Sequence, residues 1–251
     1  MFVLYIKIVY NYINYSNGEG KTIMMDIMQL NENTYRVEDD RVRYFIIEGT
    51  EKALMIDSSM NNPNAIDAAK KVTNKPIELI NTHADRDHIA GNIAFEKVYM
   101  HPAEEENYRK NGGQCTIIPV KGGDIINPGN RPLEIIDMPG HTPGSIGILD
   151  INNRVLYSGD SVQSGIIFMF GQYRNLETYI DSMKKLREYE DRFDIIYPCH
   201  DMCPVYPDLI PKLIEGAEQI LAGKAEGRDM DLFGNKVKMY KFDYAGFFCE
   251  P

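Results

Sequence analysis

Short runs of apolar and β-branched residues, separated by turn residues, dominate the first third of the chain. Residues 24–30, 34–37, 42–48 and 52–57 each have the pattern of a β-strand, and Asn, Asp and Gly pairs divide them. A meander of antiparallel hairpins fits this spacing. A further apolar run at 77–80 is typical of a buried strand.

Apolar residues recur at helical spacing in three later stretches: 65–72, 176–186 and 209–221. Asn62 is placed to cap the first of these helices, and Pro63 suits the first helical turn. Gly223 is a typical residue to end the last helix.

The second half of the chain repeats one arrangement, a short strand followed by a polar loop. Strands are predicted at 133–138, 154–157 and 193–197, and they run into PGHTPGS, SGDS and PCHD respectively. A closing strand is predicted at 236–242. Because strands alternate with helices after an all-β opening, the pattern predicts a layered α/β sandwich.

Residues 1–21 differ from the rest, since they are apolar and aromatic but contain Lys7 and several Asn. They lack the basic start and the small-residue cleavage site of a secretory signal. We interpret 1–21 as an N-terminal extension, either an edge strand or disordered, ahead of a single domain over 22–251. No apolar run reaches the roughly 18 residues of a membrane-spanning helix, so no membrane association is predicted.

Charge and cysteine content narrow the function classes. The 251 residues include 27 Lys and Arg against 37 Asp and Glu, a formal net charge of -10, which argues against binding to nucleic acid. Four scattered cysteines do not resemble a disulfide framework, so a reducing, cytoplasmic location is predicted. Cys199 and Cys203 have the spacing of half a zinc site, but no second pair completes it, and we interpret them as thiols.

Histidine and aspartate are concentrated at predicted strand ends. The segment His83-Ala-Asp85-Arg-Asp87-His88 places four metal-ligand side chains within six residues, directly after the strand at 77–80. His141, Asp160 and His200 follow later strands in the same way; the candidate ligands are therefore His83, Asp85, Asp87, His88, His141, Asp160 and His200. Imidazole with carboxylate is the ligand mixture of zinc, iron and manganese sites.

This set resembles the signature of the metallo-β-lactamase fold superfamily: H-x-H-x-D-H, then His, Asp and a final His. The resemblance covers roughly residues 24–245 and implies a four-layer αβ/βα sandwich. It also implies two divalent metal ions, one held by His83, Asp85 and His141, the other by Asp87, His88 and His200, with Asp160 bridging them. Asp87 and Asp160 would be the catalytic carboxylates, and a water acidified by the metals would be the nucleophile.

Asp85 departs from the family pattern, which usually has His at that position. It resembles the H-x-E-x-D-H form found in diiron oxygen and nitric oxide reductases of the same superfamily. The extra negative charge favours iron or manganese over zinc, although zinc also fits the remaining ligands. It also makes a bound water less acidic.

The predicted function is a binuclear metal-dependent hydrolase acting on an ester, thioester, lactone or phosphoester of a small metabolite. The alternative is a diiron oxidoreductase that reduces oxygen or nitric oxide with a separate electron donor; a third is a binding module that has lost activity. Arg86 is predicted to contact an anionic substrate group, and Phe168, Phe170 and Tyr173 to form a pocket wall. His101 is interpreted as a helix cap or surface residue, and a homodimer is left open.

Overall fold

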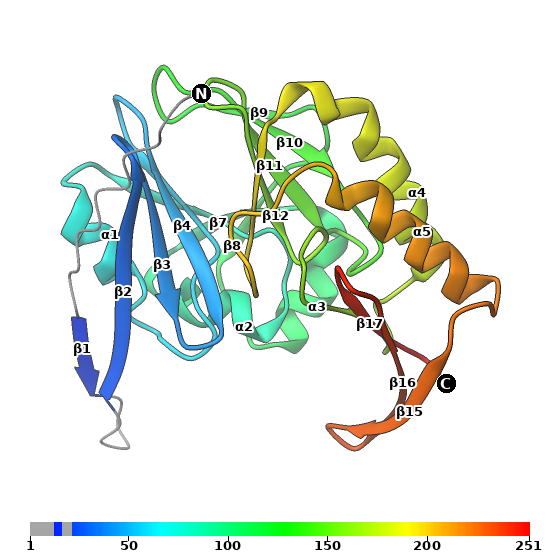
Figure 1. Ribbon diagram of the computed structural model, residues 1–251. Helices are drawn as coiled ribbons and strands as arrows, with labels where there is room; N and C mark the ends of the chain where they lie inside the picture. The colour runs from blue at the N-terminus through cyan, green and yellow to red at the C-terminus, as the bar shows by residue number, and fades with distance from the viewer. Residues whose placement is uncertain (1–12, 17–21) are drawn as a thin grey trace. The chain divides into compact units, whose positions relative to one another are not determined.

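The structure, a computed structural model, describes residues 13–16 and 22–251 (Figure 1). The chain divides into two compact units. Unit 1 runs to Val120 and includes Ile126–Pro132, and unit 2 comprises Lys121–Ile125 and Leu133–Pro251. Of the predicted extension, residues 13–16 form an edge strand, whereas 1–12 and 17–21 lie outside the described residues. The single domain over 22–251 stays a prediction.

Unit 1 is built on an eight-stranded sheet whose strands follow one another in sequence order. The strands are β1 (Ile13–Ser16), β2 (Thr22–Asn31), β3 (Thr34–Asp39), β4 (Val42–Glu48), β5 (Ala53–Ile56), β6 (Ile77–Ile80), β7 (Lys97–Met100) and β8 (Thr116–Pro119). Neighbours from β1 to β5 pair antiparallel, which confirms the predicted meander. From β5 to β8 the pairing is parallel.

Helical crossovers connect the parallel strands, as this geometry requires. They are α1 (Ile66–Val72), then α2 (Arg86–Ile89) with η1 (Ala90–Ala94), then η2 (Pro102–Glu104) with α3 (Glu105–Lys110). Because β5 and β6 are parallel neighbours, their carboxyl ends lie at the same edge of the sheet. Asp57 directly follows β5, and the His83 loop follows β6, so the topology places both at that edge.

The predicted start of the first helix is wrong. Helix α1 begins at Ile66, after a turn, and its N-cap position makes no side-chain hydrogen bond. The Asn62 side-chain oxygen instead accepts from the Asn64 amide at 2.9 Å, and its amide group contacts the Met25 sulfur at 3.0 Å. Asn62 therefore stabilises a turn that packs on β2 rather than the helix end.

The core of unit 1 lies between the sheet and its crossover helices. Ala68 and Ala69 of α1 are fully buried against strand residues such as Ile46 and Met55. Small residues on this helix face let the backbone approach the sheet closely. The buried Tyr44 hydroxyl donates to the Ala65 carbonyl at 3.1 Å, so the polar end of this core side chain is satisfied.

Unit 2 contains two sheets. The main sheet has five strands in the order β14-β12-β11-β10-β9, and the second, four-stranded sheet has the order β13-β17-β16-β15. The strands are β9 (Ile125–Ile126), at the point where the chain passes between the units, β10 (Leu133–Asp137), β11 (Ile146–Asp150), β12 (Val155–Gly159), β13 (Ile166–Met169), β14 (Ile195–Pro198), β15 (Gly227–Leu232), β16 (Asn235–Lys241) and β17 (Gly246–Cys249).

Three strands of the main sheet share a direction. β12 and β14 are parallel, and β10 and β12 are both antiparallel to β11. The carboxyl ends of β10, β12 and β14 therefore lie at one edge. His141, Asp160 and His200 follow these three strands in turn, so this edge collects all of the candidate ligands of unit 2.

Two helices complete the core of unit 2. Helix α4 (Leu176–Leu186), followed by η3 (Arg187–Arg192), lies beside α5 (Leu209–Leu221), as Figure 1 shows. Their buried faces join one apolar cluster with residues of both sheets, including Ile196 and Phe247. The α5 prediction is confirmed, and Gly223 follows it with a φ of 67°. Among the described residues, no helix is both long and apolar enough to cross a membrane.

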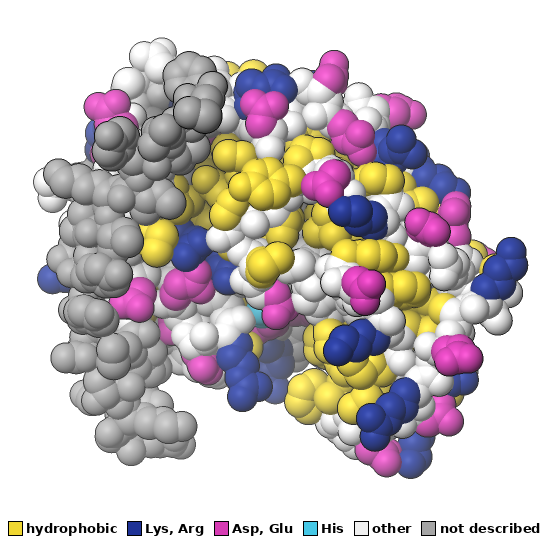
Figure 2. All heavy atoms as spheres, in the orientation of Figure 1, with side chains coloured by type: hydrophobic (Ala, Val, Ile, Leu, Met, Phe, Trp, Pro, Cys, Tyr) yellow, Lys and Arg dark blue, Asp and Glu magenta, His cyan; other side chains and the backbone are white. Residues whose placement is uncertain are grey.

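Surface charges of both signs are interspersed. On the face drawn in Figure 2, Lys and Arg side chains alternate with Asp and Glu side chains over the described residues. In unit 2, for example, Lys184 lies 2.6 Å from Glu218 across α4 and α5. Such exposed pairs contribute little to stability individually.

Gly140 fixes the loop that carries His141. Its φ is 138°, and an added Cβ would lie 2.4 Å from the Tyr179 Cα and 2.6 Å from the Tyr179 nitrogen. Its carbonyl accepts from the Asn175 amide at 2.8 Å, immediately before α4. Only glycine permits both this backbone conformation and this close approach to the helix.

We expect Gly140→Ala to lower the free energy of unfolding by about 2–4 kcal/mol, because backbone strain and a collision with α4 add together. Urea unfolding followed by circular dichroism measures the loss. Gly171→Ala is the matched control, since Gly171 has a φ of 94° with nothing within 4 Å of the added Cβ. Equal losses in the two variants would contradict the collision with α4.

Candidate metal centre

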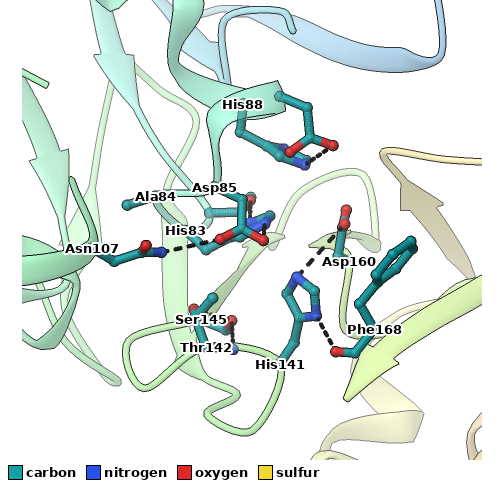
Figure 3. A network of polar contacts seen from close by, with 12 residues as sticks. His83, Ala84, Asp85, His88, Asn107, His141, Thr142, Ser145, Asp160 and Phe168 are labelled. Carbon is teal, nitrogen blue, oxygen red and sulfur yellow. Dashed lines mark hydrogen bonds and ion pairs between the residues drawn. The ribbon is translucent and has the colours of Figure 1, made fainter. Parts of the chain in front are cut away.

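The loop after β6, together with the short helix α2 that it enters, carries the four candidate ligands of unit 1 and is called the ligand loop (Figure 3). His83 and His88 are buried, and their ring centroids lie 4.1 Å apart. Asp85 and Asp87 are half-buried. Asp85 occupies the N-cap position of α2 with an extended backbone, yet its side chain makes no capping hydrogen bond. A simple helix-capping role therefore does not explain this aspartate.

A fully buried carboxylate, Asp57, holds the loop in place. It accepts from the Thr82 amide and the Thr82 hydroxyl, both at 2.8 Å, and from His88 Nδ1 at 3.0 Å. Burial alone would raise the pKa of Asp57, but the charge and hydrogen bond of His88, with smaller effects of His83 and the Thr82 amide, hold this pKa below its usual value. Asp57 therefore stays ionised. Its φ of 61° is a strained conformation that these bonds maintain.

These hydrogen bonds determine the tautomers of two histidines. An ionised carboxylate only accepts, so His88 must donate its Nδ1 proton to Asp57. The Thr82 hydroxyl donates its one proton to Asp57, so it accepts from His83 Nδ1, 3.0 Å away. When either ring is neutral, these bonds place its proton on Nδ1, so that Nε2 presents a lone pair.

Each Nε2 lone pair lies near a carboxylate oxygen of the same loop. His83 Nε2 is 3.7 Å from Asp85 Oδ2, and His88 Nε2 is 3.6 Å from Asp87 Oδ2. Both separations are longer than a hydrogen bond. Two electron-pair donors that face each other at this distance repel, unless a cation lies between them.

Unit 2 repeats the arrangement. The Asp160 Oδ2 atom lies 3.4 Å from His200 Nε2 and 3.8 Å from His141 Nε2. His141 Nδ1 lies 3.0 Å from the Phe168 carbonyl oxygen, which can only accept, so this ring also carries its proton on Nδ1 (Figure 3). Asp160 and His141 are buried. The strand ends thus supply a second set of imidazole and carboxylate donors.

The donor sets fit a divalent cation. With ligand bonds of about 2.1 Å, neighbouring donors of a tetrahedral ion lie roughly 3.4 Å apart. The four separations measured within the units, 3.4 to 3.8 Å, match this spacing. Zinc-binding histidines also characteristically donate their other ring nitrogen to a carboxylate or carbonyl, as His88 and His141 do.

The sequence profile of the metallo-beta-lactamase superfamily matches residues 37–200. The chain belongs to this superfamily. The predicted family and its α/β fold class are confirmed, and so is the predicted enzyme class, a metal-dependent hydrolase.

Two curated superfamily relatives are hydrolases. The human acyl-coenzyme A thioesterase MBLAC2 is 26% identical over 223 residues, which cover 72% of this chain and 77% of the relative. The hydroxyacylglutathione hydrolase of Hyphomonas neptunium is 27% identical over 180 residues, covering 65% of this chain and 63% of the relative.

Solved structures share the fold. A metallo-beta-lactamase from Pontibacter korlensis superposes with a TM-score of 0.68 at 14% identity, covering 77% of this chain and 99% of that protein. The sec-alkylsulfatase Pisa1 from Pseudomonas sp. also gives a TM-score of 0.68 at 15% identity, covering 86% of this chain and 49% of that protein. At these identities, the likeness establishes the fold alone.

The residues predicted to contact substrate lie in different surroundings. Arg86 is exposed and, with Ile89 and Ile93 among others, lines a cavity of about 520 Å³ in unit 1. The Phe168 ring packs against Phe170 and Phe248, with centroids 5.8 and 5.3 Å away. Tyr173 is half-buried. The role of His101 as a cap is confirmed, because its Nδ1 accepts from the Ala103 amide at 3.2 Å.

Sequence reasoning missed Asp57, Thr82 and the Phe168 carbonyl, which orient the histidines. Asp57 directly follows strand β5, and the predicted ligands also follow strands. Its position at the end of a predicted strand could therefore have identified Asp57 as a candidate site residue. The Phe168 contact uses a backbone atom, so no residue type could indicate it.

We expect Asp57→Asn to weaken metal binding about 10–100-fold. An amide has only one oxygen to accept the bonds that the two carboxylate oxygens of Asp57 accept, so the His88 ring would no longer be held with its proton on Nδ1. Competition with a chromophoric chelator measures the affinity. Long-range ¹H–¹⁵N spectra of the metal-free protein should show the proton leave His88 Nδ1 in the variant. Thr82→Ser, which keeps the hydroxyl, is the control. Unchanged spectra and affinity in Asp57→Asn would contradict this orienting role.

Proposed function

We propose that this chain is a binuclear metal-dependent hydrolase of acyl thioesters. The ligands would be the seven side chains of the family motif, His83, Asp85, Asp87, His88, His141, Asp160 and His200, grouped as the sequence resemblance implies. The observation that carries the proposal is the pairing of imidazole lone pairs with carboxylate oxygens at 3.4 to 3.8 Å in each unit.

When bound, the ions supply a water acidic enough to attack at neutral pH and a positive charge for the developing oxyanion. The chain's own residues prepare this chemistry. Asp57 holds His88 in one orientation, and the Phe168 carbonyl does the same for His141. Asp87 and Asp160 are proposed as catalytic carboxylates: both would orient the attacking water, and Asp87 would accept its one proton.

Two observations support a thioester as substrate. The names of the human and Hyphomonas relatives both describe an acyl group carried by a thiol, coenzyme A or glutathione. Arg86, beside two candidate ligands, lines a cavity together with apolar side chains. An anionic thiol carrier with an apolar acyl group would suit that combination of a guanidinium with isoleucines. Phe168, Phe170 and Tyr173 stay proposed as pocket-wall residues.

The metal identity follows from the charge of the donor set. Asp85, Asp87 and Asp160 bring three carboxylates to the proposed ligand set, and a His at position 85 would leave two. Hard, anionic donors favour iron or manganese relative to an imidazole-rich site, and zinc also fits. The hydrolase relatives favour hydrolysis over the alternative reduction of oxygen or nitric oxide. A cytoplasmic location, a lack of nucleic-acid binding and the homodimer stay predictions.

We expect His88→Ala and Asp160→Asn each to remove bound metal and to lower kcat/KM for a thioester by at least about a thousandfold, since several kcal/mol of transition-state stabilisation would be lost. Elemental analysis counts the ions, and a thiol reagent follows release of the thiol. Asp229→Asn, at an exposed strand position, is the control. Unchanged turnover in both ligand variants would contradict a binuclear mechanism.

Asp85→His should raise zinc affinity and shift the pH–rate profile to lower pH. The exchange removes one negative charge from the centre, which makes a bound water more acidic. Kinetics over a range of pH, with zinc content checked in each sample, measure the shift. A profile that stays in place or moves to higher pH would contradict the charge argument.

A further inference from the structure

Helix α3 and the residues that flank its two ends make three side-chain contacts with the ligand loop. The fully buried Glu104, just before α3, accepts from the Ala84 amide at 2.8 Å. Asn107, 3% exposed, donates from Nδ2 to Asp85 Oδ1 at 3.1 Å. Asn111 donates to the Ala84 carbonyl at 2.9 Å. Residues on both sides of the Ala84–Asp85 peptide are therefore held from one helix.

The orientation of the Asn107 amide is determined by its neighbours. Its oxygen accepts from Asn111 Nδ2 at 3.0 Å, so its amide nitrogen must face the other way. That nitrogen lies 3.1 Å from Asp85 Oδ1 and 3.5 Å from Glu104 Oε2, which both accept. The reverse orientation would place the Asn107 oxygen against two carboxylates. Asn107 is therefore fixed as a donor to Asp85.

The hydrogen bond from Asn107 gives the two carboxylate oxygens of Asp85 different surroundings. Oδ1 is held by Asn107, and Oδ2 lies 3.7 Å from His83 Nε2, at the spacing of two ligands on one ion. Aspartate is shorter than histidine, and its carboxylate rotates about a single bond. Without a fixed partner, either oxygen or both could turn toward an ion.

We propose that Asn107 is the positioning residue that allows an aspartate to serve at position 85, where the family signature has histidine. It holds Oδ1 so that Oδ2 alone is presented beside His83 Nε2. The inference rests on the proposed metal centre. An imidazole at position 85 cannot use this amide in the same way, because a ligating neutral ring carries its proton on the other nitrogen, which cannot accept a hydrogen bond from Asn107 Nδ2. The dependence on Asn107 is therefore specific to the aspartate.

A double-mutant cycle on zinc binding tests this dependence. In the full-length protein, zinc is titrated against a chromophoric chelator for wild type, Asn107→Ala, Asp85→His and the double variant. We expect Asn107→Ala to weaken one of the two zinc ions about 10–100-fold and to leave the other unchanged. In the Asp85→His background, the same substitution should change zinc affinity by less than about threefold, since the partner carboxylate is absent.

Thermal unfolding of the metal-free proteins checks that each variant folds. If Asn107→Ala fails to fold, Asn107→Ser, which keeps a polar group for Asn111, replaces it in the cycle. An equal loss of affinity in both backgrounds would overturn the positioning role in favour of a merely structural one, and so would no loss in the wild-type background. A wild type that binds no zinc, iron or manganese would contradict the proposed metal centre itself.

Discussion

Asp57 is an ionised carboxylate in the fully buried interior of unit 1, and its charge must be satisfied by hydrogen bonds. The donors it uses come from the loop after the neighbouring strand β6, namely Thr82 and His88. The need to satisfy one buried charge thus ties two parallel strand ends together. The same bonds set the direction of the His88 ring. The conformation of the loop and the orientation of the His88 ring therefore share one cause.

The two units bring polar side chains together through a similar topology. Each has a pair of parallel strands, β5 with β6 and β12 with β14, and polar side chains follow both strands of each pair. In a parallel pair, the carboxyl ends coincide, so short loops bring residues distant in sequence to one place. Asp160 and His200 are separated by a whole helix in the sequence, yet their side chains lie 3.4 Å apart. A rigid sheet gives these loops a fixed origin.

Much of the fold could be predicted from the sequence, and so could the strand ends at which the candidate ligands gather. The strands of the opening meander and the apolar faces of α4 and α5 have a clear periodicity of apolar residues. The histidines and aspartates that could bind metal follow directly after predicted strands. Strands β11 and β17 are harder to predict from the sequence. Ile146–Asp150 and Gly246–Cys249 are short and buried at every position, so they lack the alternation of apolar and polar residues that marks a strand with one exposed face. The cap predicted at Asn62 failed because a tertiary contact with Met25 competed with the local preference. No sequence motif marks Asn107, because its proposed role depends on a contact with Asp85, which lies 22 residues earlier in the chain.

Thr82 links two ligand rings through one hydrogen atom. Its hydroxyl donates to Asp57, which also holds His88, and accepts from His83. If His83 lost its Nδ1 proton, that nitrogen would become an acceptor, and a hydroxyl that rotated to donate to it would leave Asp57 without a donor in the buried interior. The protonation of the two imidazoles is therefore linked, because both rings depend on the hydrogen bonds of the same buried carboxylate. One buried charge thus fixes the ring orientations of two histidines at once, before either side chain makes any further contact.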